Sequence, residues 1–185
     1  HASIGRPNNL KSTLEKTMVD VTDFRNAMSM LSAAVNVVTT DGPAGRHGFT
    51  ASAVCSVTDT PPTLLVCMNT ASRSYEYFVQ NKVLAVNVLA DHHAPLSAVF
   101  ASKLEAQARF EHGTWHTLMT QSPILDNALV SFDCQIEQIQ EVGTHGIFIC
   151  RIEAIQQGKD QTGLVYFNRE YHAVNTIKVE TPSQP

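Results

Sequence analysis

The chain has 185 residues, 43% hydrophobic and 16% charged, and its 13 basic and 17 acidic side chains give a formal net charge of −4. This length suits one domain with a hydrophobic core, and it excludes a full dinucleotide-binding domain joined to a separate substrate domain. A mildly acidic chain has no excess of basic residues with which to bind nucleic acid or an anionic membrane. No apolar run reaches the roughly 18–20 residues that span a bilayer.

The first twenty residues are polar and weakly patterned. We expect a flexible tail over residues 1–20 and a single domain over residues 21–180. Thr22 or Asp23 has the character of a helix N-cap. Apolar residues then recur at i, i+3, i+4 and i+7, namely Phe24, Ala27, Met28 and Leu31. This spacing predicts a short amphipathic helix with one buried face.

From Ala34 the pattern becomes typical of β structure. The β-branched residues over 34–40 predict a strand, and the glycines and proline of 41–45 predict a turn after it. A second strand then runs back, and Pro61 and Pro62 end this segment because prolines do not fit a central strand. Ser72 can cap a short helix. The strands predicted in this half cover residues 34–40, 48–57, 63–68 and 83–89, and a second helix covers 94–101.

A long irregular loop, 102–127, precedes a C-terminal third rich in strands. Residues 130–137 alternate strictly between apolar and polar, and residues 147–152 are apolar on nearly both faces. Two further strands are predicted at 164–167 and 171–179. Six or seven strands with few short helices predict a mainly β fold, a closed or nearly closed antiparallel barrel.

Common catalytic motifs do not match this chain. Gly42, Gly45 and Gly48 have the spacing GxxGxxG and lead into a strand, so they predict a hairpin turn rather than a phosphate loop. The histidine pairs 92/93 and 112/116 form no HExxH pattern, and we expect no metal site. No GxSxG nucleophile elbow occurs.

The four cysteines are widely spaced and form no CxxC pair; they are Cys55, Cys67, Cys134 and Cys150. Each lies in an apolar stretch that is predicted to be a strand. We therefore expect buried thiols in a reducing, cytoplasmic compartment rather than disulfides or nucleophiles.

Two neighbouring stretches have the chemistry of a ligand site. Residues 48–58 are rich in small, hydroxyl and thiol side chains, which let a planar ligand approach the backbone. Residues 69–74 offer hydroxyls, an arginine and a helix start, which suit a phosphate. A strand with a polar face and an ordinary helix cap are the plainer interpretations. His145 lies in a glycine-flanked turn, where spacing alone favours a surface residue.

Several ordered segments carry a family resemblance: residues 24–28, 31–40, 53–62, 86–89, 143–145 and 163–167. In these segments the chain resembles the flavin reductase-like family, in particular the small reductase components of two-component aromatic hydroxylases such as 4-hydroxyphenylacetate 3-monooxygenase. The resemblance covers about residues 24–174. It implies a split antiparallel β-barrel homodimer that uses NADH to reduce FMN or FAD and delivers reduced flavin to a separate oxygenase. NADPH stays open as the electron donor.

The same resemblance implies a role for each candidate residue. His145 would lie beside the nicotinamide as the catalytic residue. The flavin ring and ribityl chain would contact Thr50, Ser52, Val54, Cys55, Ser56 and Val57. The ribityl or phosphate end would contact Asn69, Ser72, Arg73 and Ser74, and Arg169 and Tyr171 are candidates for pyridine nucleotide contact. Thr144 stands where many relatives have Asp or Ser.

Two alternatives stay open from the residues. One is a non-catalytic flavin- or haem-binding split barrel. The other is a relative of pyridoxine-phosphate oxidases, which would need a strongly basic phosphate site, and Arg73 is the one basic residue near the proposed pocket in the sequence.

Overall fold

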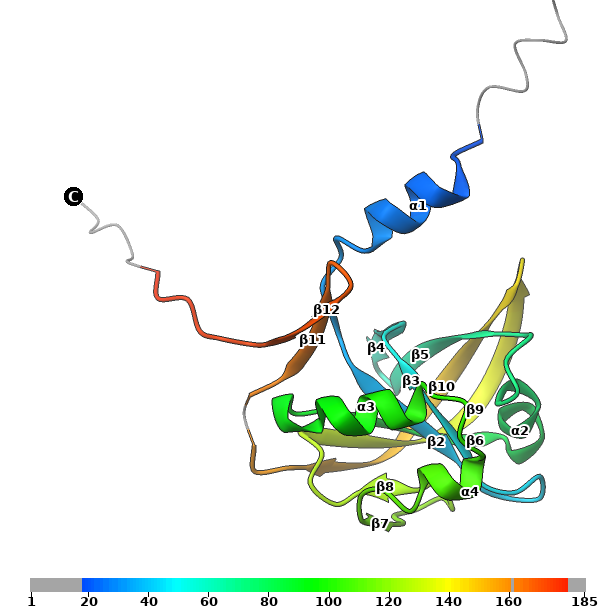
Figure 1. The fold of residues 1–185 in the computed structure, drawn as a ribbon. Helices are drawn as coiled ribbons and strands as arrows, with labels where there is room; N and C mark the ends of the chain where they lie inside the picture. Colours follow the sequence, from blue (N-terminus) through cyan, green and yellow to red (C-terminus); the bar gives the residue numbers. More distant parts are fainter. Residues whose placement is uncertain (1–17, 161, 180–185) are drawn as a thin grey trace, which may run out of the picture.

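The computed structural model describes residues 18–160 and 162–179, and its centre is one antiparallel sheet of seven strands (Figure 1). From edge to edge the strands are β3 (His47–Ala51), β2 (Asn36–Thr40), β6 (Val83–Val88), β9 (Val130–Val142), β10 (His145–Gln157), β5 (Pro62–Asn69) and β4 (Val54–Asp59). β3 and β4 are the two edges and do not pair with each other. The mainly β fold is confirmed, but strand pairing does not close the predicted barrel.

Alternating burial along the strands builds the main core. Leu64, Val66 and Met68 of β5 are buried, whereas the residues between them are partly exposed. β6 lies near the middle of the sheet, and its residues 84–87 are all buried. Phe148 and Phe78 pack edge to face with ring centroids 6.4 Å apart. The strands at 63–68 and 83–89 are thus confirmed, with alternating burial in β5 and continuous burial in the central strand β6.

Short helices cover the sheet and extend the core. They are α2 (Tyr75–Asn81), a 3-10 turn η1 (Asp91–His93), α3 (Ala94–Phe100) and α4 (Ala106–Arg109). The predicted long loop contains α4 and a two-stranded ribbon, β7 (Trp115–His116) with β8 (Ile124–Leu125). Phe100, Phe110 and Trp115 pack together there as a second aromatic core.

The predicted strand over residues 48–57 is two strands. The backbone N–H of Val54 donates to the carbonyl of Ser52 at 3.0 Å, a tight turn that separates β3 from β4. The chain thus leaves one edge of the sheet and enters the opposite edge within residues 52 and 53. Small side chains at these positions, Ser52 and Ala53, permit the bend and leave it exposed.

The first helix, α1 (Val21–Met28), begins two residues earlier than predicted. Asp20 is the N-cap, and its carboxylate accepts from the amide of Thr22 at 2.7 Å. The predicted buried face is wrong for the single chain, because no residue of α1 is buried and Phe24 remains 56% exposed. The helix extends away from the body (Figure 1). The predicted tail lies mostly outside the described residues, and the domain limits 21–180 stay a prediction.

A small three-stranded sheet lies beside α1. It pairs β1 (Ala33–Ala34) with β11 (Leu164–Phe167), and β11 with β12 (Glu170–Ala173). Asn168 and Arg169 form the hairpin turn with φ of 49° and 64°. The strand predicted over 171–179 ends at Ala173, and the chain continues without regular structure to residue 179.

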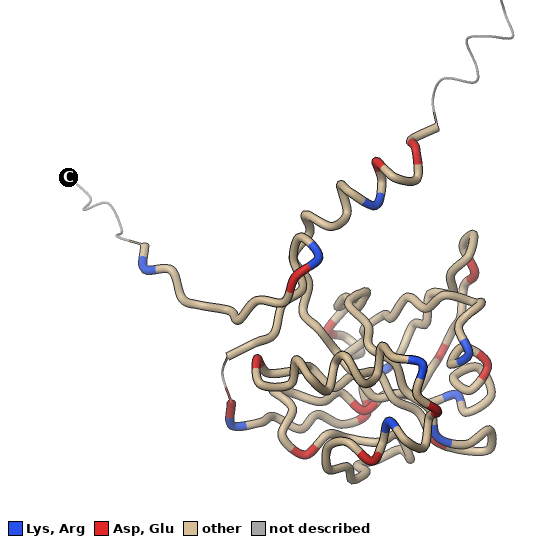
Figure 2. Tube along the Cα trace, in the orientation of Figure 1, with Lys and Arg blue, Asp and Glu red and all other residues tan. Residues whose placement is uncertain are grey.

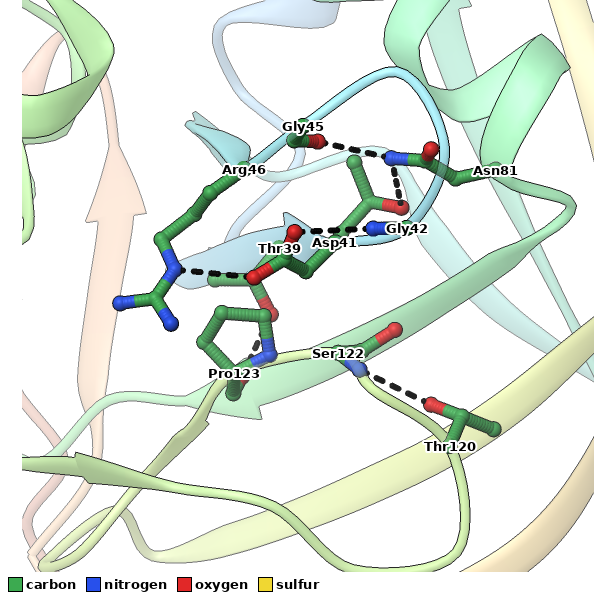
Figure 3. A network of polar contacts seen from close by, with 10 residues as sticks. Thr39, Asp41, Gly42, Gly45, Arg46, Asn81, Thr120, Ser122 and Pro123 are labelled. Atoms are coloured by element: carbon green, nitrogen blue, oxygen red, sulfur yellow. Dashed lines mark hydrogen bonds and ion pairs between the residues drawn. The ribbon is translucent and has the colours of Figure 1, made fainter.

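The glycine-rich segment after β2 is a hairpin turn, as predicted. Asn81 Nδ2 donates to the carbonyl of Gly45 at 2.9 Å (Figure 3). Asn81 Oδ1 accepts from the amide of Ala44 at 2.8 Å. Gly42 donates its amide to Asp41 Oδ1 at 2.8 Å. Because the amides of Gly42, Ala44 and Gly45 donate to acceptors within the protein, they are not available to bind a phosphate.

A buried carboxylate anchors the loop before β8. Asp133 is fully buried and accepts from the amides of Met119 (2.8 Å) and Thr120 (2.7 Å) and from the Thr120 hydroxyl (2.5 Å). Asp133→Ala removes the acceptor atoms of all three hydrogen bonds and should lower the free energy of unfolding by about 3 kcal/mol in chemical denaturation. A loss below about 0.5 kcal/mol would contradict this anchoring role.

The cysteines have two environments. Cys134 and Cys150 are buried as predicted, and burial raises the pKa of both thiols, that of Cys150 to about 12. Cys55 is exposed on the edge strand β4, which contradicts the prediction for this residue, and Cys67 is half-buried. All four thiols are free.

Basic and acidic residues are interspersed along the Cα trace in Figure 2. Among the residues that the structure describes, no helix is long and apolar enough to cross a membrane. The same residues contain no group of three or more side chains from His, Cys, Asp and Glu arranged for a metal ion.

Candidate active site

Two adjoining hollows lie where β3, β5 and the loop before α2 meet. The first, which we call the ring hollow, has a volume of about 230 Å³ and is lined by residues 49–53, 67–69, 72 and 145. The second, the cationic hollow, has a volume of about 370 Å³ and is lined by residues 47, 49, 50, 72–74, 100–103 and 109. They share Phe49, Thr50 and Ser72, so one elongated ligand can occupy both.

The ring hollow has the surface that a planar ligand needs. Ala51, Ser52 and Ala53 present small side chains, and Phe49 and Met68 add apolar surface. Its polar groups come from Thr50, Ser52, Asn69, Ser72 and His145. A mostly small and apolar lining with a few placed polar groups is typical of cofactor sites.

His145 reaches the ring hollow because of strand register. It is the first residue of β10 and pairs with Asn69 at the end of β5. Gly143, with φ of 56°, makes the tight turn that precedes it. Gly146 follows, and a Cβ there would lie 2.6 Å from Tyr75 Oη. Only glycine lets β10 begin against the Tyr75 ring and keeps His145 at this point.

The cationic hollow concentrates positive charge. Arg73 and Lys103 line it from the surface, and Arg73 Nη1 lies 3.3 Å from Glu105 Oε1 in an exposed ion pair. Arg109 is 7% exposed and donates to the carbonyls of Gly48 (2.7 Å), Ser102 (2.8 Å) and Leu104 (2.9 Å). Three cations and one carboxylate leave a net positive site that suits a phosphate.

His47 forms the inner wall of the cationic hollow as a neutral imidazole. Burial, followed by repulsion from Arg109 and Arg73, lowers the pKa of His47. Its Nδ1 accepts from the amide of Gly48 at 3.0 Å and lies 2.8 Å from Ser74 Oγ. The neutral ring therefore carries its proton on Nε2.

A larger hollow lies elsewhere and is a weaker candidate. It has a volume of about 680 Å³ and is lined by His116, Asp126, Asn127 and residues 156–160. Apart from Gly158 its lining residues are polar, so the hollow has no aliphatic, Phe, Tyr or Trp side chain against which a ring could lie. We therefore place the site at the two adjoining hollows.

Seven of the predicted site residues line these hollows: Thr50, Ser52, Asn69, Ser72, Arg73, Ser74 and His145. Val54, Cys55, Ser56 and Val57 lie on β4, directly after the small-residue turn, and line neither hollow. Ser72 does not cap α2, because Ser74 occupies the N-cap position and makes no side-chain cap bond. Instead, Ser72 Oγ accepts from the amide of Ser74 at 3.2 Å.

The two C-terminal candidates lie in the small sheet, away from the lining. Arg169 Nη2 donates to Asn26 Oδ1 at 2.7 Å and so connects the hairpin to α1. Tyr171 Oη lies 2.7 Å from Ser97 Oγ, and the carbonyl of Ser97 accepts from Thr50 Oγ1 at 2.6 Å. Tyr171 is thus connected to the site through Ser97, without lining either hollow.

Sequence reasoning missed His47, Lys103 and Arg109. Lys103 and Arg109 lie in the long segment that was predicted as a loop, and loop length was the one signal that could have directed attention there. Their convergence with Arg73 depends on how α4 packs against β3.

Comparison with known proteins agrees with this geometry. The family model described as the flavin reductase like domain matches residues 28–175. The chain belongs to the flavin reductase-like family. The FMN reductase (NADH) RutF of Serratia proteamaculans (strain 568) is 56% identical over 161 residues, which covers 87% of this chain and 92% of that protein.

Solved structures of flavin reductase-like proteins share the fold. One from Haemophilus somnus 129PT has a TM-score of 0.82 and 54% sequence identity, and the match covers 84% of this chain and 100% of that one. The styrene monooxygenase flavin reductase (SMOB) from Pseudomonas putida S12 has a TM-score of 0.75 and 25% identity, with 85% and 99% of the two chains covered.

Proposed function

We propose that this member of the flavin reductase-like family is an NADH-dependent flavin reductase that reduces FMN. The observation that carries the proposal is the junction of the two hollows, where small residues adjoin three cations. This arrangement suits a flattened ring at one end and a phosphate at the other. The Serratia relative, named an FMN reductase (NADH), supports the same ligand pair.

In the proposed reaction, the nicotinamide supplies a hydride from its C4 atom to N5 of the flavin. The protein's task is to hold the two rings face to face at about 3–3.5 Å and to exclude other arrangements. Ser52 and backbone amides of the ring hollow would donate to the polar edge of the flavin, where negative charge develops. His145 would orient the nicotinamide from the opposite wall.

The wider context is part of the same proposal. We propose a cytoplasmic homodimer whose reduced flavin passes to a separate aromatic-ring monooxygenase. The name of the styrene monooxygenase flavin reductase supports an oxygenase partner. The exposed apolar residues of α1, Val21, Phe24 and Met28, support burial against a second copy. Four free thiols suit a reducing compartment.

Consumption of NADH in the presence of a large excess of FMN over enzyme tests this function. Many turnovers per site are expected, because flavin is a substrate that leaves after reduction. Binding of flavin with no turnover of FMN or FAD would instead show a non-catalytic flavin-binding protein.

The phosphate end makes a separate prediction about flavin choice. Replacing Arg73 with Met removes a cation from the cationic hollow, and Arg73 does not line the ring hollow. We expect FMN to bind about ten-fold more weakly, with riboflavin binding unchanged, because riboflavin has no phosphate. Flavin fluorescence titration measures both constants. Arg151→Met, which removes an exposed arginine paired with Glu137 and Glu153, is the control. Equal losses for both flavins would contradict the assignment.

A further inference from the structure

Thr144, in the turn before His145, forms hydrogen bonds with two residues next to or within the ring hollow, His145 and Thr70. Thr144 Oγ1 lies 2.9 Å from Nδ1 of His145. The carbonyl of Thr144 accepts two hydrogen bonds from Thr70, one from its amide at 3.0 Å and one from its hydroxyl at 3.1 Å. Thr70 directly follows Asn69, a lining residue of the ring hollow.

An exposed histidine at the start of a strand has little else to hold its ring. Nδ1 is the one ring nitrogen of His145 with a hydrogen-bond partner in the described part of the chain, and that partner is the Thr144 hydroxyl. With Nδ1 engaged in this way, Nε2 is the nitrogen that stays available to a ligand in the ring hollow. The contact therefore selects one ring orientation before any substrate arrives.

The contact with Thr70 sets the position of the whole turn. Residues 69–72 carry Asn69 and Ser72, two polar groups of the ring hollow, and Thr70 joins this segment to the turn of residues 143–144. The histidine and the flavin-side groups thus belong to one hydrogen-bonded unit that spans two loops far apart in the sequence.

We propose that Thr144 is a positioning residue for hydride transfer, acting through His145, and that Thr70 holds it in place. This inference rests on the proposed function. It assigns to the middle residue of the turn the task of presenting His145 Nε2 to the nicotinamide. Flavin affinity does not depend on it, because Thr144 lines neither hollow.

A double-mutant cycle with purified full-length protein tests the proposal. Thr144→Val removes the hydroxyl and keeps the side-chain shape. We expect kcat/KM for NADH to fall about three- to ten-fold, the effect of one lost hydrogen bond, while FMN affinity and the thermal midpoint stay unchanged. Thr144→Ser restores the hydroxyl and should recover most of the activity. Thr63→Val, which removes a hydroxyl bonded to the carbonyl of Pro61 on the far end of β5, is the control.

The decisive readout is the same substitution in a His145→Ala background. If Thr144 acts through His145, Thr144→Val should have no further effect there. An equal loss in both backgrounds, or wild-type kinetics for Thr144→Val, would overturn the proposal. Wild-type protein that does not oxidise NADH with FMN would overturn the proposed function itself, so the two failures are distinguishable.

Discussion

His145→Ala should lower kcat/KM for NADH by about ten- to a hundred-fold while FMN affinity changes little. The imidazole lines the ring hollow together with the small residues, and its removal takes away the group proposed to orient the nicotinamide. Because the side chain is exposed and packs against no core, the thermal midpoint should not change. Steady-state kinetics with varied NADH at saturating FMN measures the effect.

His112→Ala is the matched control for this substitution. His112 is also exposed, but it lies at a different hollow, beside His92 and Leu125. Its replacement should leave both kinetic constants unchanged. If kcat/KM for NADH is the same for His145→Ala as for the wild type, His145 has no role in the reaction.

Arg109→Met should weaken both the fold and the cationic hollow. The guanidinium joins β3 to the segment 100–104 through carbonyls of Gly48, Phe100, Ser102 and Leu104. Methionine fills a similar volume but donates no hydrogen bond, so these buried acceptors lose their partner. We expect the free energy of unfolding to fall by about 3 kcal/mol in chemical denaturation.

The functional effect of Arg109→Met follows from the same contacts. Without the hydrogen bonds of Arg109, the segment 100–104 is no longer held against β3, and Lys103 on this segment is no longer fixed at the hollow. The cationic hollow also loses the positive charge of Arg109. FMN should therefore bind at least about ten-fold more weakly, with a smaller loss for riboflavin. Arg151→Met is again the surface control, with no change in either quantity. Full stability with unchanged FMN affinity would show that Arg109 has neither role.

The first part of β9 was predictable from its sequence, but its burial was not. The alternation over residues 130–137 predicted a strand, whereas both faces of that strand are covered, because the polar residues Ser131 and Asp133 are fully buried as well. The extension to Val142 was not predictable, since Gln138, Gln140 and Glu141 have no apolar alternation and are paired only through β10. Backbone pairing between two long strands overrides side-chain pattern there.

For α1 the period was right and the inferred environment was wrong. Phe24 and Met28 do share a helical face, yet the single chain leaves that face exposed. Periodicity shows that a face is apolar but not what covers it. The apolar stripe is therefore the feature that most strongly favours a second copy in the assembly.

The site was predictable in its local parts only. His145 was found because its segment matches a family motif, and Thr50 and Ser52 were found because residues 48–58 are rich in small and hydroxyl side chains. All three residues line the ring hollow. Arg109 was missed because it lies on α4, in the segment predicted to be a loop, and only tertiary packing brings its guanidinium to the site. The family motif predicted that residues 54–57 contact the flavin. The turn at residues 52 and 53 instead leads these residues into β4, where they line neither hollow.

The most direct test of the account is hydride transfer in a single turnover. FMN and enzyme are mixed without oxygen, NADH is added, and the visible absorbance of oxidised flavin is followed in time. We predict rapid loss of this absorbance, slowed when the transferring hydrogen of NADH is replaced by deuterium and slowed further by His145→Ala. Flavin that stays oxidised in the presence of NADH and wild-type enzyme would contradict the central claim.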